Sequence, residues 1–231
     1  GSYYYVGILL NVLYDDKKYS RDEITEVYLG VNGSRLLNWL AEAGEFDRNS
    51  EVNELLSCML SKGSGFDDTE ITTKLSEKPK DEVACGLVLS ETPIEGKGKK
   101  DKDALIAGES CQINDERISA ESRLDLEPLD LEEEDIKEFK ILEPINVAKF
   151  LYEFHRALKD LRIEGITRLP NYELSPELDR NSKLWGEVKD EITNLLLKQK
   201  GKNSETIRLE PPFIICLKAL LNVLSKQWAG K

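Results

Sequence analysis

The chain has 231 residues, of which 32 are basic and 44 acidic, so its formal net charge is −12 at pH 7. Nucleic acids and anionic membrane surfaces need clustered positive charge, so this balance argues against both as partners. There is no apolar run near the roughly 20 residues of a membrane span, and no signal peptide is visible. The 4 cysteines lie far apart and there is 1 histidine, which argues against a zinc site or a disulfide scaffold. We therefore expect a cytoplasmic protein with reduced thiols.

The beginning of the chain is typical of an excised segment. Gly1-Ser2 has the composition of a scar left by tag removal. It leads at once into an apolar stretch, where Tyr4, Ile8 and Val12 recur at helical spacing and predict a helix over residues 3–14. We expect the sequence to be a fragment of a longer protein.

A strand, a glycine turn and a helix follow. A β-prone run predicts a strand over residues 24–29, and Gly30, Asn32 and Gly33 tolerate the positive φ angles of a sharp turn. Ser34 is a good cap for a helix over 34–43. Such a turn presents free backbone N–H groups at the positive end of a helix, which suits a nucleotide or another anion. A turn with a purely structural role is the alternative.

The next elements repeat this order of helix and strand. Apolar spacing predicts a helix over 51–62, which Gly63-Ser64-Gly65 ends. Alternation over 70–75 predicts a strand. A further helix is predicted over 79–90, with Pro79 in its first turn and small residues near its middle.

Two segments, residues 25–40 and residues 74–89, together resemble the adenosine-binding end of the superfamily that contains actin, the heat-shock chaperone ATPases and the sugar kinases. In that superfamily an apolar strand enters a Gly-Gly-x-Ser turn, and a Pro-x-x-x-Val-Ala-x-Gly helix comes later. The matching positions are Gly30, Gly33, Ser34 and Arg35, then Pro79, Val83, Ala84 and Gly86. The resemblance covers residues 3–90; it departs from the pattern where Val31-Asn32 separates the glycines and where Lys80 replaces an acidic residue.

The resemblance implies an α/β fold, with a partial actin-like nucleotide-binding lobe of strand–helix units over residues 1–91. It implies that Gly30, Asn32, Gly33 and Ser34 line the base and ribose of ATP or ADP. Arg35 would lie beside the adenine, since a planar cation stacks on an aromatic base.

In the superfamily the phosphate loops and the catalytic carboxylate belong to upstream segments. The fragment is therefore expected to be non-catalytic by itself and to hold no metal, although the parent protein would be an ATPase. Its expected partners are an adenine nucleotide and the upstream lobe of that parent.

Residues 92–142 are predicted to form a loop, short strands and an acidic connector. Apolar runs within 104–113 indicate a hairpin or two short strands. Residues 121–140 carry 9 acidic and 3 basic side chains, which favours an exposed connector anchored by its leucines.

Residues 143–231 are predicted to be a mainly helical C-terminal region. Helices are expected over 144–162, from Asn181 or Ser182 to about Lys200, and over 212–228. These predicted helices leave an alternative function open, a non-enzymatic helical protein-interaction module in which the glycine turn is purely structural.

The resemblance also bears on oligomeric state. It places the strand Ile24–Leu29 at the centre of a five-stranded sheet, whose three preceding strands are absent from this sequence. The strand then becomes an open edge, which favours a homodimer of the fragment through a continuous sheet. Fold-back of residues 104–113 onto this edge is the alternative.

Overall fold

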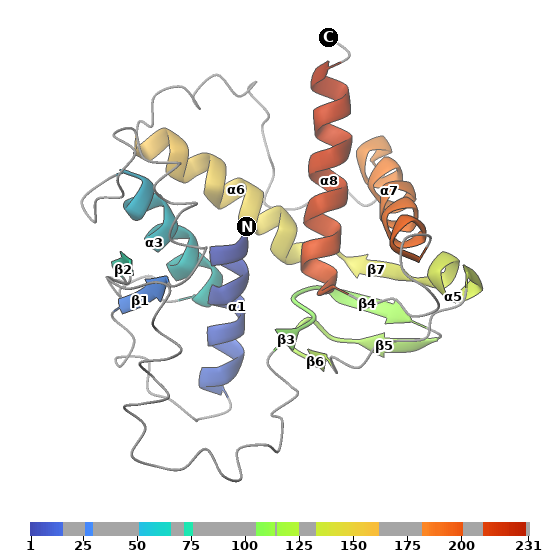
Figure 1. The fold of residues 1–231 in the computed structure, drawn as a ribbon, viewed down its shortest axis with the longest axis horizontal. Helices are drawn as coiled ribbons and strands as arrows, with labels where there is room; N and C mark the ends of the chain where they lie inside the picture. Colours follow the sequence, from blue (N-terminus) through green and yellow to red (C-terminus); the bar gives the residue numbers. More distant parts are fainter. Residues whose placement is uncertain are drawn as a thin grey trace. The chain divides into compact units, whose positions relative to one another are not determined.

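The computed structural model describes residues 1–15, 26–29, 51–65, 72–75, 105–113, 115–124, 133–161, 182–200 and 210–229. The chain divides into two compact units. The N-terminal unit comprises Ser2–Asp101 and Phe154–Leu169, and the C-terminal unit comprises Gly1, Lys102–Glu153 and Pro170–Lys231. The described residues form both helices and short strands, and the helices predominate (Figure 1). This mixture is consistent with the predicted α/β class in its general form.

The N-terminal unit is built on a close pair of helices, α1 (Ser2–Asp15) and α3 (Glu51–Ser64). Both confirm helices predicted from apolar spacing. Gly7 of α1 and Gly63 of α3 lie at their crossing, where Gly63 comes against the Tyr4 carbonyl group. Helix α3 therefore continues past the position where it was predicted to end. Gly65, whose φ is 71°, follows its last residue.

Two parallel strands also belong to this unit. Strand β1 (Glu26–Leu29) pairs with β2 (Thr72–Leu75), and Leu29 is the register partner of Leu75. Both strands were predicted. Parallel strands need a long crossover, and here it contains α3. The predicted helices over 34–43 and 79–90 lie outside the described residues.

The C-terminal unit contains a three-stranded antiparallel sheet in the order β5-β4-β7, and a separate pair of strands, β3 and β6. Alternation places Cys111 and Ile113 of the central strand in the core. The strand bounds are β3 Leu105–Ile106, β4 Ser110–Ile113, β5 Glu116–Ile118, β6 Arg123–Leu124 and β7 Lys140–Glu143. Residues 105–113 thus contain two short strands, which pair with different partners and form no hairpin with each other.

In its described part, the acidic stretch 121–140 contains more regular structure than the predicted connector, and Leu124 is among the buried residues that anchor it. It contains β6 and the short helix α5 (Glu133–Glu138), and β7 begins at its last residue. Ile136 and Phe139 are buried and anchor it. The net charge of the stretch does not reveal these apolar anchors.

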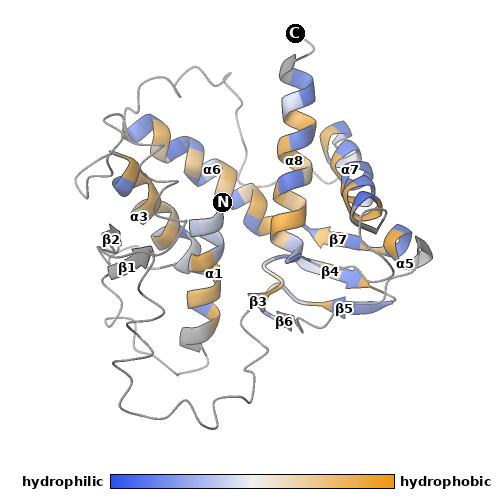
Figure 2. Ribbon diagram, viewed as in Figure 1, coloured by the Kyte–Doolittle hydropathy of each residue, from blue (hydrophilic) through white to orange (hydrophobic). Residues whose placement is uncertain are grey.

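Three longer helices supply most of the core, and all three were predicted. They are α6 (Ile145–Asp160), α7 (Lys183–Lys200) and α8 (Pro212–Ala229). The Ser182 hydroxyl oxygen accepts the Trp185 backbone N–H at 3.2 Å, so Ser182 is the cap of α7. Helix α8 is hydrophobic through most of its first turns (Figure 2), yet within the described residues no helix is long and apolar enough to cross a membrane.

Helices α7 and α8 pack together in the C-terminal unit. Trp185 is 1% exposed and begins a buried stripe along α7. On α8, Phe213 is fully buried and meets the edge of the Phe150 ring of α6, with 6.4 Å between ring centroids. The stripe on α7 continues through Val188, Ile192 and Leu196.

Candidate functional site

The residues predicted to bind a nucleotide follow directly after β1. Gly30, Asn32, Gly33, Ser34 and Arg35 themselves lie outside the described residues. What the structure describes is the strand that leads into them.

The parallel pair fixes where two segments leave the sheet. Strand β1 ends at Leu29 and β2 ends at the paired Leu75, so the chain continues from the same edge in both places. One continuation begins at Gly30, and the other leads to the Pro79 motif. In open α/β sheets, ligands bind outside the carboxyl ends of the strands. The described β1–β2 pair is parallel, as in such sheets.

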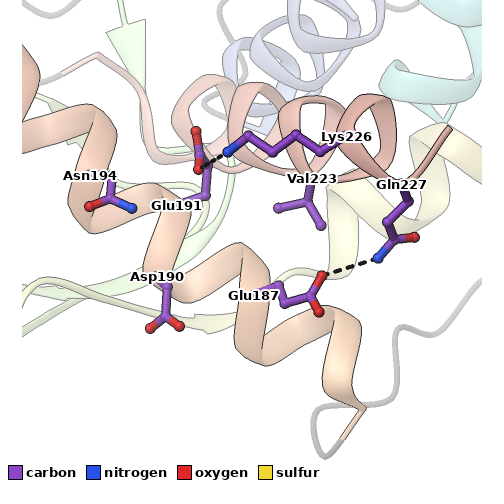
Figure 3. A pocket seen from close by; sticks show the side chains of 7 residues that line it. All are labelled: Glu187, Asp190, Glu191, Asn194, Val223, Lys226 and Gln227. Atoms are coloured by element: carbon purple, nitrogen blue, oxygen red, sulfur yellow. Dashed lines mark hydrogen bonds and ion pairs between the residues drawn. The ribbon is translucent and has the colours of Figure 1, made fainter. Parts of the chain in front are cut away.

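A second candidate is the hollow between α7 and α8, with a volume of about 370 Å³ (Figure 3). Glu191 is buried at its centre, where its carboxylate accepts hydrogen bonds from the Lys226 ammonium at 2.7 Å and the Asn222 amide at 3.2 Å. Farther along, the Gln227 amide donates to Glu187 at 3.1 Å. The residues that line the hollow are Glu187, Asp190, Glu191, Asn194, Val223, Lys226 and Gln227.

One ion pair, between Lys226 and Glu191, lies in this hollow beside the carboxylates of Glu187 and Asp190. The hydrogen bond from Lys226 lowers the pKa of Glu191 and outweighs the effect of burial. A carboxylate with a lowered pKa stabilises the fold above its unfolded pKa, and the contribution is lost as the pH falls through the folded value. Among the described residues, no group of three His, Cys, Asp or Glu side chains is placed to hold a metal ion. The α7–α8 hollow is therefore best understood as a polar link between two helices.

A third cluster surrounds Glu109, between β3 and β4. Its side chain is 1% exposed, and its carboxyl oxygen accepts the Val147 backbone N–H at 2.5 Å. The Asn146 amide donates to the Gly108 carbonyl at 2.7 Å, and the Phe213 backbone N–H donates to the Ala107 carbonyl at 3.1 Å. Residues 107–109 thus accept hydrogen bonds from the first turns of both α6 and α8.

The ionisable groups around this cluster are shifted by burial. Burial raises the pKa of Glu109 to about 8, while hydrogen bonds from the backbone N–H groups of Val147, Asn146 and Ile145 act in the opposite direction. Burial, and then the charge of Glu109, raise the pKa of the Cys216 thiol. Burial alone raises the pKa of Cys111 to about 12. Thiols with raised pKa values are poor nucleophiles, so neither cysteine suits covalent catalysis.

The sequence reasoning missed Glu109. Its only signal is a single acidic residue within the apolar runs of residues 104–113. The partner that explains its burial is the first turn of α6, which lies 38 residues farther along the chain.

No family model, no curated protein and no solved structure matches the chain. The resemblance to actin-like ATPases therefore rests on the motifs within residues 25–86. Strands β1 and β2, with α3 between them in sequence, are described elements that lie within the resemblance.

Proposed function

We propose that the chain supplies the adenosine half of a nucleotide site, as part of an actin-like or chaperone-like ATPase in the cytoplasm. The observation that carries the proposal is the parallel pairing of β1 with β2. It supports a common edge for the Gly30–Arg35 turn and the segment that contains the Pro79 motif.

The chemistry of the turn suits adenosine. Gly30, Asn32, Gly33 and Ser34 line the base and ribose in this proposal, because small residues let a ligand approach the backbone closely. Arg35 stacks beside the adenine.

The chain does not hydrolyse ATP by itself in this proposal. The sequence contains no Asp-x-Gly motif of the kind that holds the phosphates in the superfamily. The upstream lobe of the parent ATPase supplies that half. The test is calorimetric titration with ADP of the chain and of its Gly33→Val variant.

The alternative proposal is a helical protein-interaction module with a structural glycine turn. It predicts no binding of adenine nucleotides by either protein. The same titration therefore separates the two proposals.

We also propose that β1 mediates a homodimer. Strands β3 and β4, which occupy the segment named in the fold-back alternative, pair with β5, β6 and β7 instead. Within the described ranges, β1 pairs with β2 along one edge, and no other strand pairs with the second edge of β1. An open edge is a template for pairing with a second copy.

Sedimentation of the chain tests the homodimer. We expect the mass of a dimer at high concentration, and that of a monomer for Val27→Lys, because a charge on a short edge strand opposes strand pairing. Ser225→Lys, at an exposed position on α8, is the control and should leave the dimer intact. A wild-type monomer with unchanged mass in Val27→Lys would rule out pairing through β1.

A further inference from the structure

Helix α6 belongs to both compact units. Its residues 145–153 lie in the C-terminal unit and its residues 154–160 in the N-terminal unit.

The first turn of α6 is capped by a residue distant in sequence. The first N–H groups of a helix have no partner within the helix, and a short side chain just before it usually satisfies them. Here residue 144 is a proline, which has no such side chain. The Val147 N–H is instead hydrogen-bonded to the Glu109 side chain, and the N–H groups of Asn146 and Ile145 also act on that carboxyl group. Glu109 is thus a tertiary cap.

The environment of this cap is buried, and among the described residues no cation pairs with it. From α6 it is faced by the three N–H groups, and from α8 by the Cys216 thiol, the titratable group that its charge affects. In the part of the chain that the structure describes, no lysine or arginine forms an ion pair with Glu109. An ionised carboxylate buried without a counter-ion is unfavourable, even when N–H groups solvate it in part.

We propose that Glu109 is a pH-sensitive latch on the first turn of α6. The neutral carboxyl group accepts the helix N–H groups within a buried site and holds the turn closed. Loss of its proton to the solvent leaves an unpaired buried charge, and opening of the turn admits water to that charge.

The direction of the pH effect follows from the raised pKa of Glu109. Because burial raises the pKa of Glu109 to about 8, the folded state holds the proton more tightly than the unfolded state. The latch is therefore fully closed below the ordinary glutamate pKa, and it weakens as the pH rises through about 8. The Glu191 contribution on α7 has the opposite sign, since it is lost as the pH falls. A local measurement is needed to separate the two.

The experiment is amide hydrogen exchange of the whole chain at pH 6 and pH 9, with each rate corrected for its intrinsic pH dependence. For Ile145, Asn146 and Val147 we expect the protection factor to fall by about tenfold or more, since one pKa unit corresponds to a factor of ten. Protection of the Ile192 amide on α7 should not change. In Glu109→Gln, which keeps an acceptor oxygen but cannot ionise, all these amides should keep their protection.

Two results would overturn the proposal. One is an equal fall in wild-type protein and Glu109→Gln, and the other is a rise of wild-type protection with pH. If Glu109→Gln does not fold, the titration of the Glu109 carboxyl carbon by NMR in wild-type protein decides instead. A midpoint near 8 supports the latch, and a midpoint at or below the ordinary value of about 4.5 contradicts it.

Discussion

Replacement of Gly63 by valine is expected to lower the free energy of unfolding of the N-terminal unit by about 3 kcal/mol or more. A side chain at this position meets backbone atoms. Its Cβ would come against the Tyr4 carbonyl oxygen, and would lie 3.0 Å from the Tyr4 carbonyl carbon and 3.2 Å from the Cα of Gly7. Backbone atoms in a helix cannot rotate away as a side-chain tip can, so α1 and α3 must separate.

The same argument applies from the other helix. A Cβ at Gly7 would lie 2.8 Å from the Ser64 nitrogen and 2.9 Å from the Gly63 carbonyl carbon. Gly7→Val should therefore destabilise α1 against α3 to a similar extent. Urea unfolding followed by circular dichroism, with amide exchange of α1, measures both variants.

Gly186 supplies the matched control. It lies in the exposed face of α7, and a Cβ there meets nothing within 4 Å. Gly186→Ala should stabilise the protein by about 0.5–1 kcal/mol, because alanine favours the helical backbone. If Gly63→Val were as harmless as Gly186→Ala, the close crossing of α1 and α3 would be wrong.

The second large effect is expected for Trp185→Ala, which should lower the stability of the C-terminal unit by about 3–5 kcal/mol. Trp185 is 1% exposed and lies at the start of the buried stripe of α7. Its removal leaves a cavity that the surrounding helices cannot fill completely. Urea unfolding of the variant and the wild-type chain gives the difference.

A variant of Lys189 distinguishes the packing of the Trp185 ring from its cation–π contact. The Lys189 ammonium lies 5.8 Å from the Trp185 ring centroid, on the exposed side. Lys189→Ala removes only this cation–π contact and should cost about 0.5–1 kcal/mol. A loss below about 1 kcal/mol for Trp185→Ala would show that the ring is not part of the core.

The helices could be predicted from the sequence because their apolar residues recur over several turns. Helix α7 is the clearest case, where Trp185 and Ile192 lie on one buried stripe and Ser182 caps the first turn. Strands β1 and β2 were found from β-prone residues between turn signals. These features depend on local spacing, which a sequence records directly.

The remaining elements depend on tertiary partners. Strands β5, β6 and β7 and helix α5 have only two to six residues each, too few for a periodic pattern in a charged stretch. Gly63-Ser64-Gly65 does end α3, as predicted, but the local sequence does not reveal that Gly63 contacts α1, which lies more than 40 residues earlier. Glu109 is buried because a distant helix supplies its hydrogen bonds. None of these partners can be read from the neighbouring sequence.

The nucleotide-site residues were predicted from motif resemblance, and they stay a prediction. The described strand β1 ends one residue before Gly30. The pairing of β1 with β2 is consistent with the proposed site but does not by itself require a ligand.

Calorimetric titration with ADP is the most direct test of the proposed adenosine site. We expect weak binding, with a dissociation constant on the order of 1 mM, because half a site buries little area. Gly33→Val should abolish it, since a branched side chain blocks close approach to the backbone, whereas Gly186→Val on the exposed face of α7 should retain it. An affinity for ADP that Gly33→Val leaves unchanged, or no binding by the wild-type chain at millimolar ADP, would contradict the assignment.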